Sequence, residues 1–292
     1  MQALFGQLLI GLINGAFYAM LSLGLAVIFG LLNIINFTHG AQYMMGAFCA
    51  WLLLQYAHVG DYYLGYWWAL VIAPLVVGAI GIVIERTMLS RLYKLDHLYG
   101  LLLTFGLALV IQGVFRNEFG SSGLPYQIPS LLTGGVNLGF MFLPIYRAWV
   151  IVASLVICLA TWYVIERTKL GSYLRAATEN RELVQAFGVN VPRMITLTFG
   201  FGVALAALAG VMAAPIYQVN PLMGADLIIV VFAVVVIGGM GSIMGAILTG
   251  FALGVIEGLT KYFYPEASST VIFVIMVIVL LVRPAGLFGR ER

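Results

Sequence analysis

Charged residues are scarce in this chain. Only 9% of the 292 residues are Asp, Glu, Lys or Arg, whereas 63% are hydrophobic. Soluble domains carry roughly 25% charged residues, so this chain has too few polar groups to cover a water-facing surface. The net charge of +3 is small, and we therefore expect no nucleic-acid partner. The composition predicts a protein that is solvated by a lipid bilayer.

Residues typical of catalytic and metal sites are also nearly missing. Cys49 and Cys158 lie inside apolar runs, as buried free thiols do. No CxxC, HExxH or Walker A pattern occurs. Residues 120–123 read GSSG and match the GxSG of intramembrane serine proteases, but no histidine follows His97 to act as base. We expect no catalytic residue, no metal site and no cofactor, which disfavours an intramembrane enzyme.

The middle of the apolar segments almost lacks ionisable residues. Asp226 and Glu257 fall at predicted outer ends, and Glu257 can pair with Lys261 one helical turn later. A stand-alone carrier driven by protons or sodium more often has a carboxylate in mid-membrane. The sequence therefore favours a transporter whose energy source lies in another protein, with a secondary carrier as the weaker alternative.

Long apolar stretches predict an all-α polytopic membrane protein with about 8–9 transmembrane segments, some of them short or broken. A GGMGS turn at 238–242 interrupts the last long stretch and predicts two short helices joined by a tight turn. The predicted segments are 4–32, 41–57, 67–84, 98–115, 148–165, 196–217, 226–237, 243–259 and 270–282.

The distribution of Lys and Arg predicts the orientation of the chain. Basic residues concentrate in three places: the connection near Arg86, the segment 166–195, and the tail from Arg283 onward. If these share the cytoplasmic side, the N-terminus lies outside and the C-terminus lies in the cytoplasm. All but three of the 14 basic residues are then inside, and the exceptions are Arg116, Arg147 and Lys261.

Glycine spacing indicates close helix contacts and a faint internal repeat. Gly250, Gly254 and Gly258 form a small-xxx-small face, which suits tight packing within the chain or a subunit interface. An Asn-x3-Gly pattern occurs at 36–40 and again at 220–224. By the predicted orientation, the first pattern faces the cytoplasm and the second faces out. Two halves of a chain in opposite orientations are typical of transporters. We expect a single transmembrane domain, 1–292, with a first repeat over 1–117, a linking part over 148–195 and a second repeat over 196–283.

Neutral polar residues within the apolar core are the candidates for a substrate path. Most such residues join helices, but those between residues 33 and 42 are denser than that role needs. A path lined by neutral hydrogen-bonding groups suits a zwitterionic or uncharged solute. The candidates are Asn14, Tyr18, Asn33, Asn36, Thr38, His39, Gly40, Asn220 and Gly224.

Residues 166–195, here called the charged segment, are the one long charge-dense stretch of the chain. The run 179–182 is predicted to begin a short amphipathic helix with Leu183, Ala186 and Phe187 on one side. Gly188 is predicted to end this helix as a C-cap. A plain solvated linker is the alternative. We expect a rigid projection that docks a cytoplasmic partner.

Three motifs together resemble the permeases of bacterial branched-chain amino acid ABC transporters, in particular the H-type subunit of the high-affinity leucine/isoleucine/valine importer. They are the N-terminal run GLINGAFYAM at 11–20 continuing to INFTHG at 35–40, the run RAATENR at 175–181 continuing to AFGV, and GGMGS at 238–242. The usual small residue of the INFAHG pattern is Thr38 here, a mild departure. The resemblance covers nearly the whole chain.

The resemblance implies an inner-membrane permease that works by alternating access. Implied partners are a second, homologous permease subunit, two cytoplasmic ATPase subunits and a periplasmic amino-acid-binding protein. The charged segment would then be the ATPase-coupling loop, with Arg175, Glu179, Asn180, Arg181, Glu182, Phe187 and Gly188 as its contact residues. Import of urea or short amides by the same class of protein is the alternative within this family.

Overall fold

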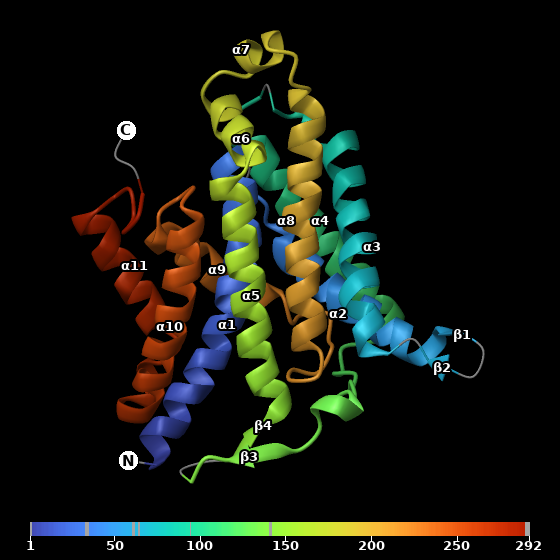
Figure 1. Ribbon diagram of the computed structural model, residues 1–292, viewed down its shortest axis with the longest axis vertical. Coiled ribbons are helices and arrows are strands. Elements are labelled where there is room, and N and C mark those ends of the chain that lie inside the picture. The colour runs from blue at the N-terminus through green and yellow to red at the C-terminus, as the bar shows by residue number, and fades with distance from the viewer. Residues whose placement is uncertain are drawn as a thin grey trace.

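The computed structural model describes residues 2–32, 35–59, 62–63, 65–93, 95–139 and 142–289. This part of the chain is a bundle of helices with the N-terminus at one end and the C-terminus near the other (Figure 1). The long helices are α1 (Gln2–Leu32), α2 (Thr38–Tyr56), α3 (Tyr66–Thr87), α4 (His97–Phe119), α5 (Ile145–Arg167), α8 (Val191–Ala213) and α10 (Ile243–Phe263). The shorter ones are α6 (Lys169–Glu179), α7 (Arg181–Ala186), α9 (Ala225–Gly238) and α11 (Val271–Val282).

Short elements connect the helices. Single 3-10 turns are η1 (Leu89–Arg91), η2 (Ser130–Leu132) and η3 (Pro265–Ala267). Two antiparallel hairpins, which the apolar pattern did not predict, pair β1 (His58–Val59) with β2 (Tyr62–Tyr63) and β3 (Gly135–Asn137) with β4 (Phe142–Pro144). The β3–β4 hairpin lies at the end of the molecule opposite to α7, whereas β1–β2 projects from the side of the half farther from α7 (Figure 1).

The predicted all-α membrane protein is confirmed at the level of fold class. Within the described residues, six helices are long and apolar enough to cross a bilayer: α1, α3, α4, α5, α8 and α10. Helices α9 and α11 are apolar but shorter. Helix α8 starts five residues before the predicted 196 because Asn190 caps it: its Oδ1 accepts the N–H of Arg193 at 3.1 Å. Pro192 fits this first turn, where its missing N–H costs no hydrogen bond.

Helix α1 is the central element of the bundle. Most of its apolar length is buried, and it packs against α10, α8, α5 and α9. The contact with α10 is close: a Cβ on Gly254 would lie 2.3 Å from the Cα of Gly15, and one on Gly11 would lie 2.4 Å from the Gly254 oxygen. The glycine face of α10 therefore packs inside this chain rather than being free for a subunit interface.

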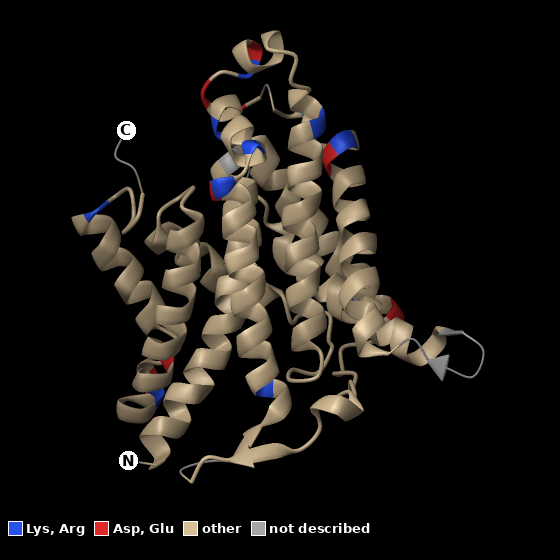
Figure 2. Ribbon diagram, viewed as in Figure 1, with Lys and Arg blue, Asp and Glu red and all other residues tan. Residues whose placement is uncertain are grey.

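The basic residues gather at one end of the bundle, as the sequence predicts. Figure 2 shows Lys and Arg around α6 and α7 and at the neighbouring ends of α3, α5 and α8, with a further one at the end of α11. The opposite end has few. Lys94, Arg290 and Arg292 lie outside the described residues.

Candidate translocation and coupling sites

Two helices begin in the interior of the bundle rather than at its surface. At the start of α2, the His39 Nε2 lies 3.0 Å from the Leu21 carbonyl, in the middle of α1. At the start of α9, a Cβ on Gly224 would lie only 1.9 Å from the Gly40 oxygen. From this contact, here called the mid-depth crossing, α2 runs toward the β1–β2 hairpin and α9 toward the opposite end (Figure 1). The two Asn-x3-Gly motifs thus meet at one place.

Beside the crossing, three buried polar side chains bond to one another. Asn36 donates from Nδ2 to the Gln42 Oε1 at 3.0 Å, Gln42 donates to the Thr38 Oγ1 at 3.2 Å, and the Thr38 hydroxyl donates to the Asn36 Oδ1. Nearby, Thr104 of α4 accepts the N–H of Phe37 at 3.2 Å. Thr104 also donates to the Ile35 oxygen at 3.2 Å, so its hydroxyl satisfies backbone groups of the break between α1 and α2 within the protein, as a membrane interior demands.

A second group of predicted path residues lies nearer the N-terminal end of the bundle. The Tyr18 hydroxyl donates to the Glu257 Oε2 at 2.7 Å, and Lys261 contacts the Glu257 Oε1 at 2.5 Å, which confirms the predicted pair. The Tyr217 hydroxyl donates to the Asn14 Oδ1 at 2.8 Å. These contacts join α1 to α10 and to the turn after α8.

The remaining path candidates differ in their surroundings. Asn220 bonds locally: its Oδ1 accepts the N–H of Leu222 at 3.0 Å and its Nδ2 donates to the Gln218 oxygen at 3.1 Å. His39 is fully buried, and its Nδ1 has no hydrogen-bond partner among the described residues. Asn33 lies outside the described residues. The structure thus brings Asn36, Thr38, His39, Gly40 and Gly224 together. Asn14, Tyr18 and Asn220 form their hydrogen bonds with other residues.

The charged segment contains two helices rather than one. Helix α6 was not predicted, and Glu179 is its last residue instead of the start of the docking helix. Arg175 holds α6 to the end of α5, since its guanidinium donates to the Ile165 oxygen at 3.1 Å and pairs with Glu166 at 3.3 Å. Both charged groups of that pair are about 40% exposed, so its share of the stability is small.

Helix α7 has the local signals that the sequence predicts for the docking helix. The Asn180 Oδ1 caps it by accepting the N–H of Leu183 at 2.9 Å. Gly188, two residues after its end, has φ +84°, which side chains other than glycine rarely adopt. Leu183 is 54% exposed and Phe187 is 80% exposed. Glu182 is also exposed, so α7 presents an apolar ridge beside an acidic group.

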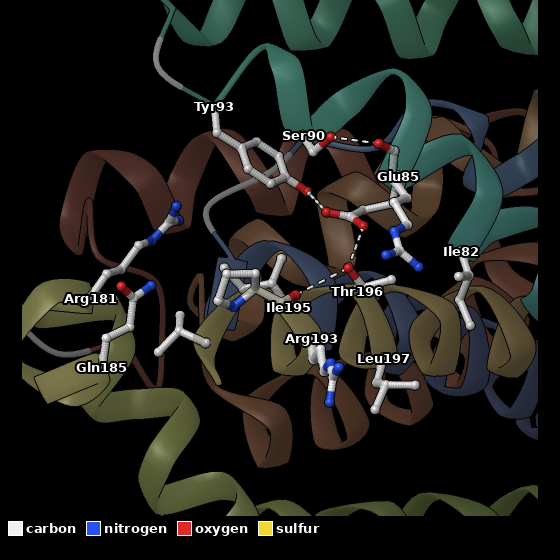
Figure 3. Close-up of a pocket in the computed structure, with 13 residues that line it drawn as sticks. Ile82, Glu85, Ser90, Tyr93, Arg181, Gln185, Arg193, Ile195, Thr196 and Leu197 are labelled. Carbon is white, nitrogen blue, oxygen red and sulfur yellow. Dashed lines mark hydrogen bonds between the residues drawn. The ribbon is translucent and has the colours of Figure 1, made fainter. Parts of the chain in front are cut away.

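A groove of about 590 Å³ separates α7 from the ends of α3 and α8 (Figure 3). On its wall the Glu85 carboxylate, 2% exposed, accepts the Tyr93 hydroxyl at 2.6 Å and the Thr196 hydroxyl at 2.7 Å. The guanidinium of Arg181 stands 5.8 Å from the centre of the Tyr93 ring, a cation–π distance. Burial first, and then the hydrogen bond to Glu85, raises the pKa of Tyr93 well above its ordinary value, so the phenol remains the donor.

Sequence reasoning missed the Glu85 cluster, by which we mean Glu85, Tyr93 and Thr196. The predicted span ended at residue 84, so Glu85 was assigned to the connection. A signal was available, because Ala73, Val77 and Gly81 follow each other at intervals of four and the next position of that buried face is Glu85.

The chain matches the family model described as "Branched-chain amino acid transport system / permease component" over residues 7–280. It is 30% identical to the high-affinity branched-chain amino acid transport system permease protein LivH of Escherichia coli (strain K12), covering 97% of this chain and 95% of that protein. It is also 30% identical to the high-affinity branched-chain amino acid transport system permease protein BraD of Pseudomonas aeruginosa, covering 97% of this chain and 95% of that protein.

A more distant relative is LivM of Escherichia coli (strain K12), a permease protein of the high-affinity branched-chain amino acid transport system. The identity is 29%, over 94% of this chain and 68% of that protein. No solved structure matches the chain. The family match spans most of the chain and agrees with a polytopic helical fold that contains two interior helix starts. The chain belongs to the branched-chain amino acid transport permease family and is a multi-pass inner-membrane protein.

Proposed function

We propose that this chain is the H-type membrane subunit of an ABC importer that moves leucine, isoleucine and valine inward by alternating access. The family membership carries the substrate class, because the relatives described above are named for branched-chain amino acids. None of those three names refers to urea or amides, so the alternative within the class has no observation in its favour.

In this proposal ATP is hydrolysed by two separate cytoplasmic subunits that dock on the charged segment. Support comes from α7, a capped helix at the basic end of the molecule with Phe187 80% exposed. Apolar side chains left exposed at such a place mark a docking surface. Arg175, Glu179, Asn180, Arg181, Glu182 and Gly188 frame this ridge or hold it in position.

The basic end of the bundle faces the cytoplasm in this proposal, with the N-terminus outside and nine membrane passes. The concentration of Lys and Arg at that end supports the orientation (Figure 2). Residues 1–117 and 196–283 form two inverted repeats, joined by 148–195. The mid-depth crossing supports this division, because one helix from each repeat, α2 and α9, begins there and the two run in opposite directions.

The transport path follows the mid-depth crossing and the polar residues around it. A second, homologous permease subunit completes the path, and a periplasmic binding protein delivers the amino acid. The likeness of this chain to both LivH and LivM, two permease proteins of one transport system, supports a pair of related permeases. Asn36, Thr38 and His39 shape the crossing, and Asn14, Tyr18 and Asn220 lie on its outer side.

Competition for uptake tests the substrate class. The complete transporter in proteoliposomes with ATP inside should accumulate labelled leucine. Excess isoleucine or valine should abolish that signal, whereas excess urea should leave it unchanged. If urea reduces leucine uptake and isoleucine and valine do not, the protein would be assigned to amide import instead.

A further inference from the structure

The Glu85 carboxylate joins three separate parts of the chain at the basic end of the bundle. Glu85 belongs to the last turn of α3, Tyr93 to the connection between α3 and α4, and Thr196 to the second turn of α8. Figure 3 shows both hydroxyl groups directed at the two carboxylate oxygens. No described Lys, Arg or His forms an ion pair with Glu85, so hydroxyl donors alone hold this buried group.

A buried carboxylate held in this way is costly to disturb. Removing one donor leaves an oxygen without its hydrogen bond in a site that water reaches poorly. The three elements are therefore expected to move together rather than one at a time. Arg181, the first residue of α7, lies over the Tyr93 ring and adds the docking helix to this unit.

From the cluster, tight helix contacts lead toward the middle of the membrane. A Cβ on Gly81 of α3 would lie 2.8 Å from the Val203 side chain of α8. Two turns further along the same face of α8, a Cβ on Gly210 would lie 2.0 Å from the Tyr43 oxygen of α2. Helix α2 then begins at the mid-depth crossing. Such close backbone contacts transmit displacement because they leave little room for sliding.

We propose that Glu85 is a positioning residue that converts movement of α7 into movement of the α3–α8 pair, and so couples ATP hydrolysis to opening of the transport path. This rests on the proposed docking of ATPase subunits at α7. Glu85 does not touch the transported amino acid in this scheme. It acts through Tyr93 and Thr196, and its loss separates hydrolysis from transport rather than preventing assembly.

The test compares variants of the complete transporter in proteoliposomes by three readouts: capture of the ATPase subunits, ATP hydrolysis, and leucine moved per ATP hydrolysed. Glu85→Leu removes both acceptor oxygens, and Tyr93→Phe removes one donor while keeping the ring beneath Arg181. We expect normal capture for both and at least about a 5-fold fall in leucine moved per ATP. Glu85→Gln keeps one acceptor oxygen and replaces the other with an NH2 group, so it should retain part of the ratio that Glu85→Leu loses.

Thr87→Val is the matched control. It removes an exposed hydroxyl, half a turn from Glu85, that among the described residues bonds only to the Val83 oxygen of its own helix. It should leave all three readouts unchanged. An unchanged ratio in Tyr93→Phe, which is the variant least disturbing to the fold, would overturn the proposal even if Glu85→Leu fails to fold. Loss of capture in Tyr93→Phe would also overturn it, because the cluster would then only support the docking surface. If the unmodified protein captures no ATPase subunit, the proposed function fails instead.

Discussion

At the scale of single residues, the mid-depth crossing depends on the absence of two side chains. Gly40 and Gly224 meet backbone to backbone, and a Cβ on either would fall within 2.4 Å of the other's carbonyl oxygen. Neither neighbour can yield by rotating a side chain, because the atoms in contact belong to the main chain. The contact lets two helices start at the same depth, which a larger residue would prevent.

We therefore expect Gly224→Ala to lower the free energy of unfolding by about 3 kcal/mol, the upper end of the usual cost of overpacking. Thermal unfolding of the purified protein in detergent measures this. The control is Gly113→Ala in α4, where no atom lies within 4 Å of the added Cβ. Alanine is favoured over glycine in a helix interior by about 1 kcal/mol, so the control should be neutral or slightly stabilised. If Gly224→Ala and Gly113→Ala change the unfolding temperature equally, the close contact of Gly40 with Gly224 would be refuted.

Some contacts of single residues could be predicted from the sequence and others could not. The pair of Glu257 and Lys261 follows from their spacing of four within one helix. The bonds among Asn36, Thr38 and Gln42 depend on how the chain turns between α1 and α2, and composition alone does not specify that turn. Glu85 was missed because hydropathy assigns a carboxylate to water, whereas hydroxyl donors from distant parts of the chain allow its burial.

At the scale of elements, α7 is the helix that we propose docks the ATPase subunits. It is six residues long, too short to be a stable helix alone. Its cap at Asn180, the positive φ at Gly188 and the contact of Arg181 with Tyr93 hold it in place. Val184 faces inward and is buried, while Leu183 and Phe187 face out. A short helix with both ends fixed presents its ridge without a large entropic cost on docking.

Reversing the charge at Glu182 or substituting Gly188 should weaken docking of the ATPase. We expect Glu182→Lys and Gly188→Glu each to reduce capture of the ATPase subunit in a pull-down by roughly 10-fold, which corresponds to about 1.4 kcal/mol. Matched controls lie at the other end of the bundle: Glu266→Lys in η3, and Gly120→Glu, where the glycine also has a positive φ of +76°. All four variants should insert normally. Capture that survives both changes in α7 would exclude it as the docking helix.

The boundaries of the elements show where sequence patterns lose precision. Predicted apolar runs overlap each of the six described helices that are long and apolar enough to cross a bilayer, because hydropathy is averaged over many residues. They placed the start of α8 at 196 instead of 191, since Pro192 and Arg193 interrupt the apolar run and the start is defined by the Asn190 cap. They also gave no sign of α6, whose amphipathic pattern lies within a stretch dominated by charge. Local hydrogen bonds decide such boundaries, and average hydropathy does not detect them.

At the scale of the whole molecule, the proposed function requires that transport be driven by partner subunits rather than by an ion-coupling carboxylate of this chain. Among the described residues the buried carboxylates are Glu85 and Glu257. The first is held by two hydroxyl groups at the end of α3, and the second by Tyr18 and Lys261. Both are engaged in structural contacts, so neither is placed as an exchangeable proton or sodium site at the mid-depth crossing.

Reconstitution of the purified chain by itself tests this account most directly. Liposomes containing only this protein, with a proton or sodium gradient across the membrane, should not accumulate labelled leucine. Liposomes that also contain the partner permease, the ATPase subunits and the binding protein should accumulate it when ATP is supplied on the cytoplasmic side of the transporter. Concentrative uptake by the chain alone under either gradient would contradict the account.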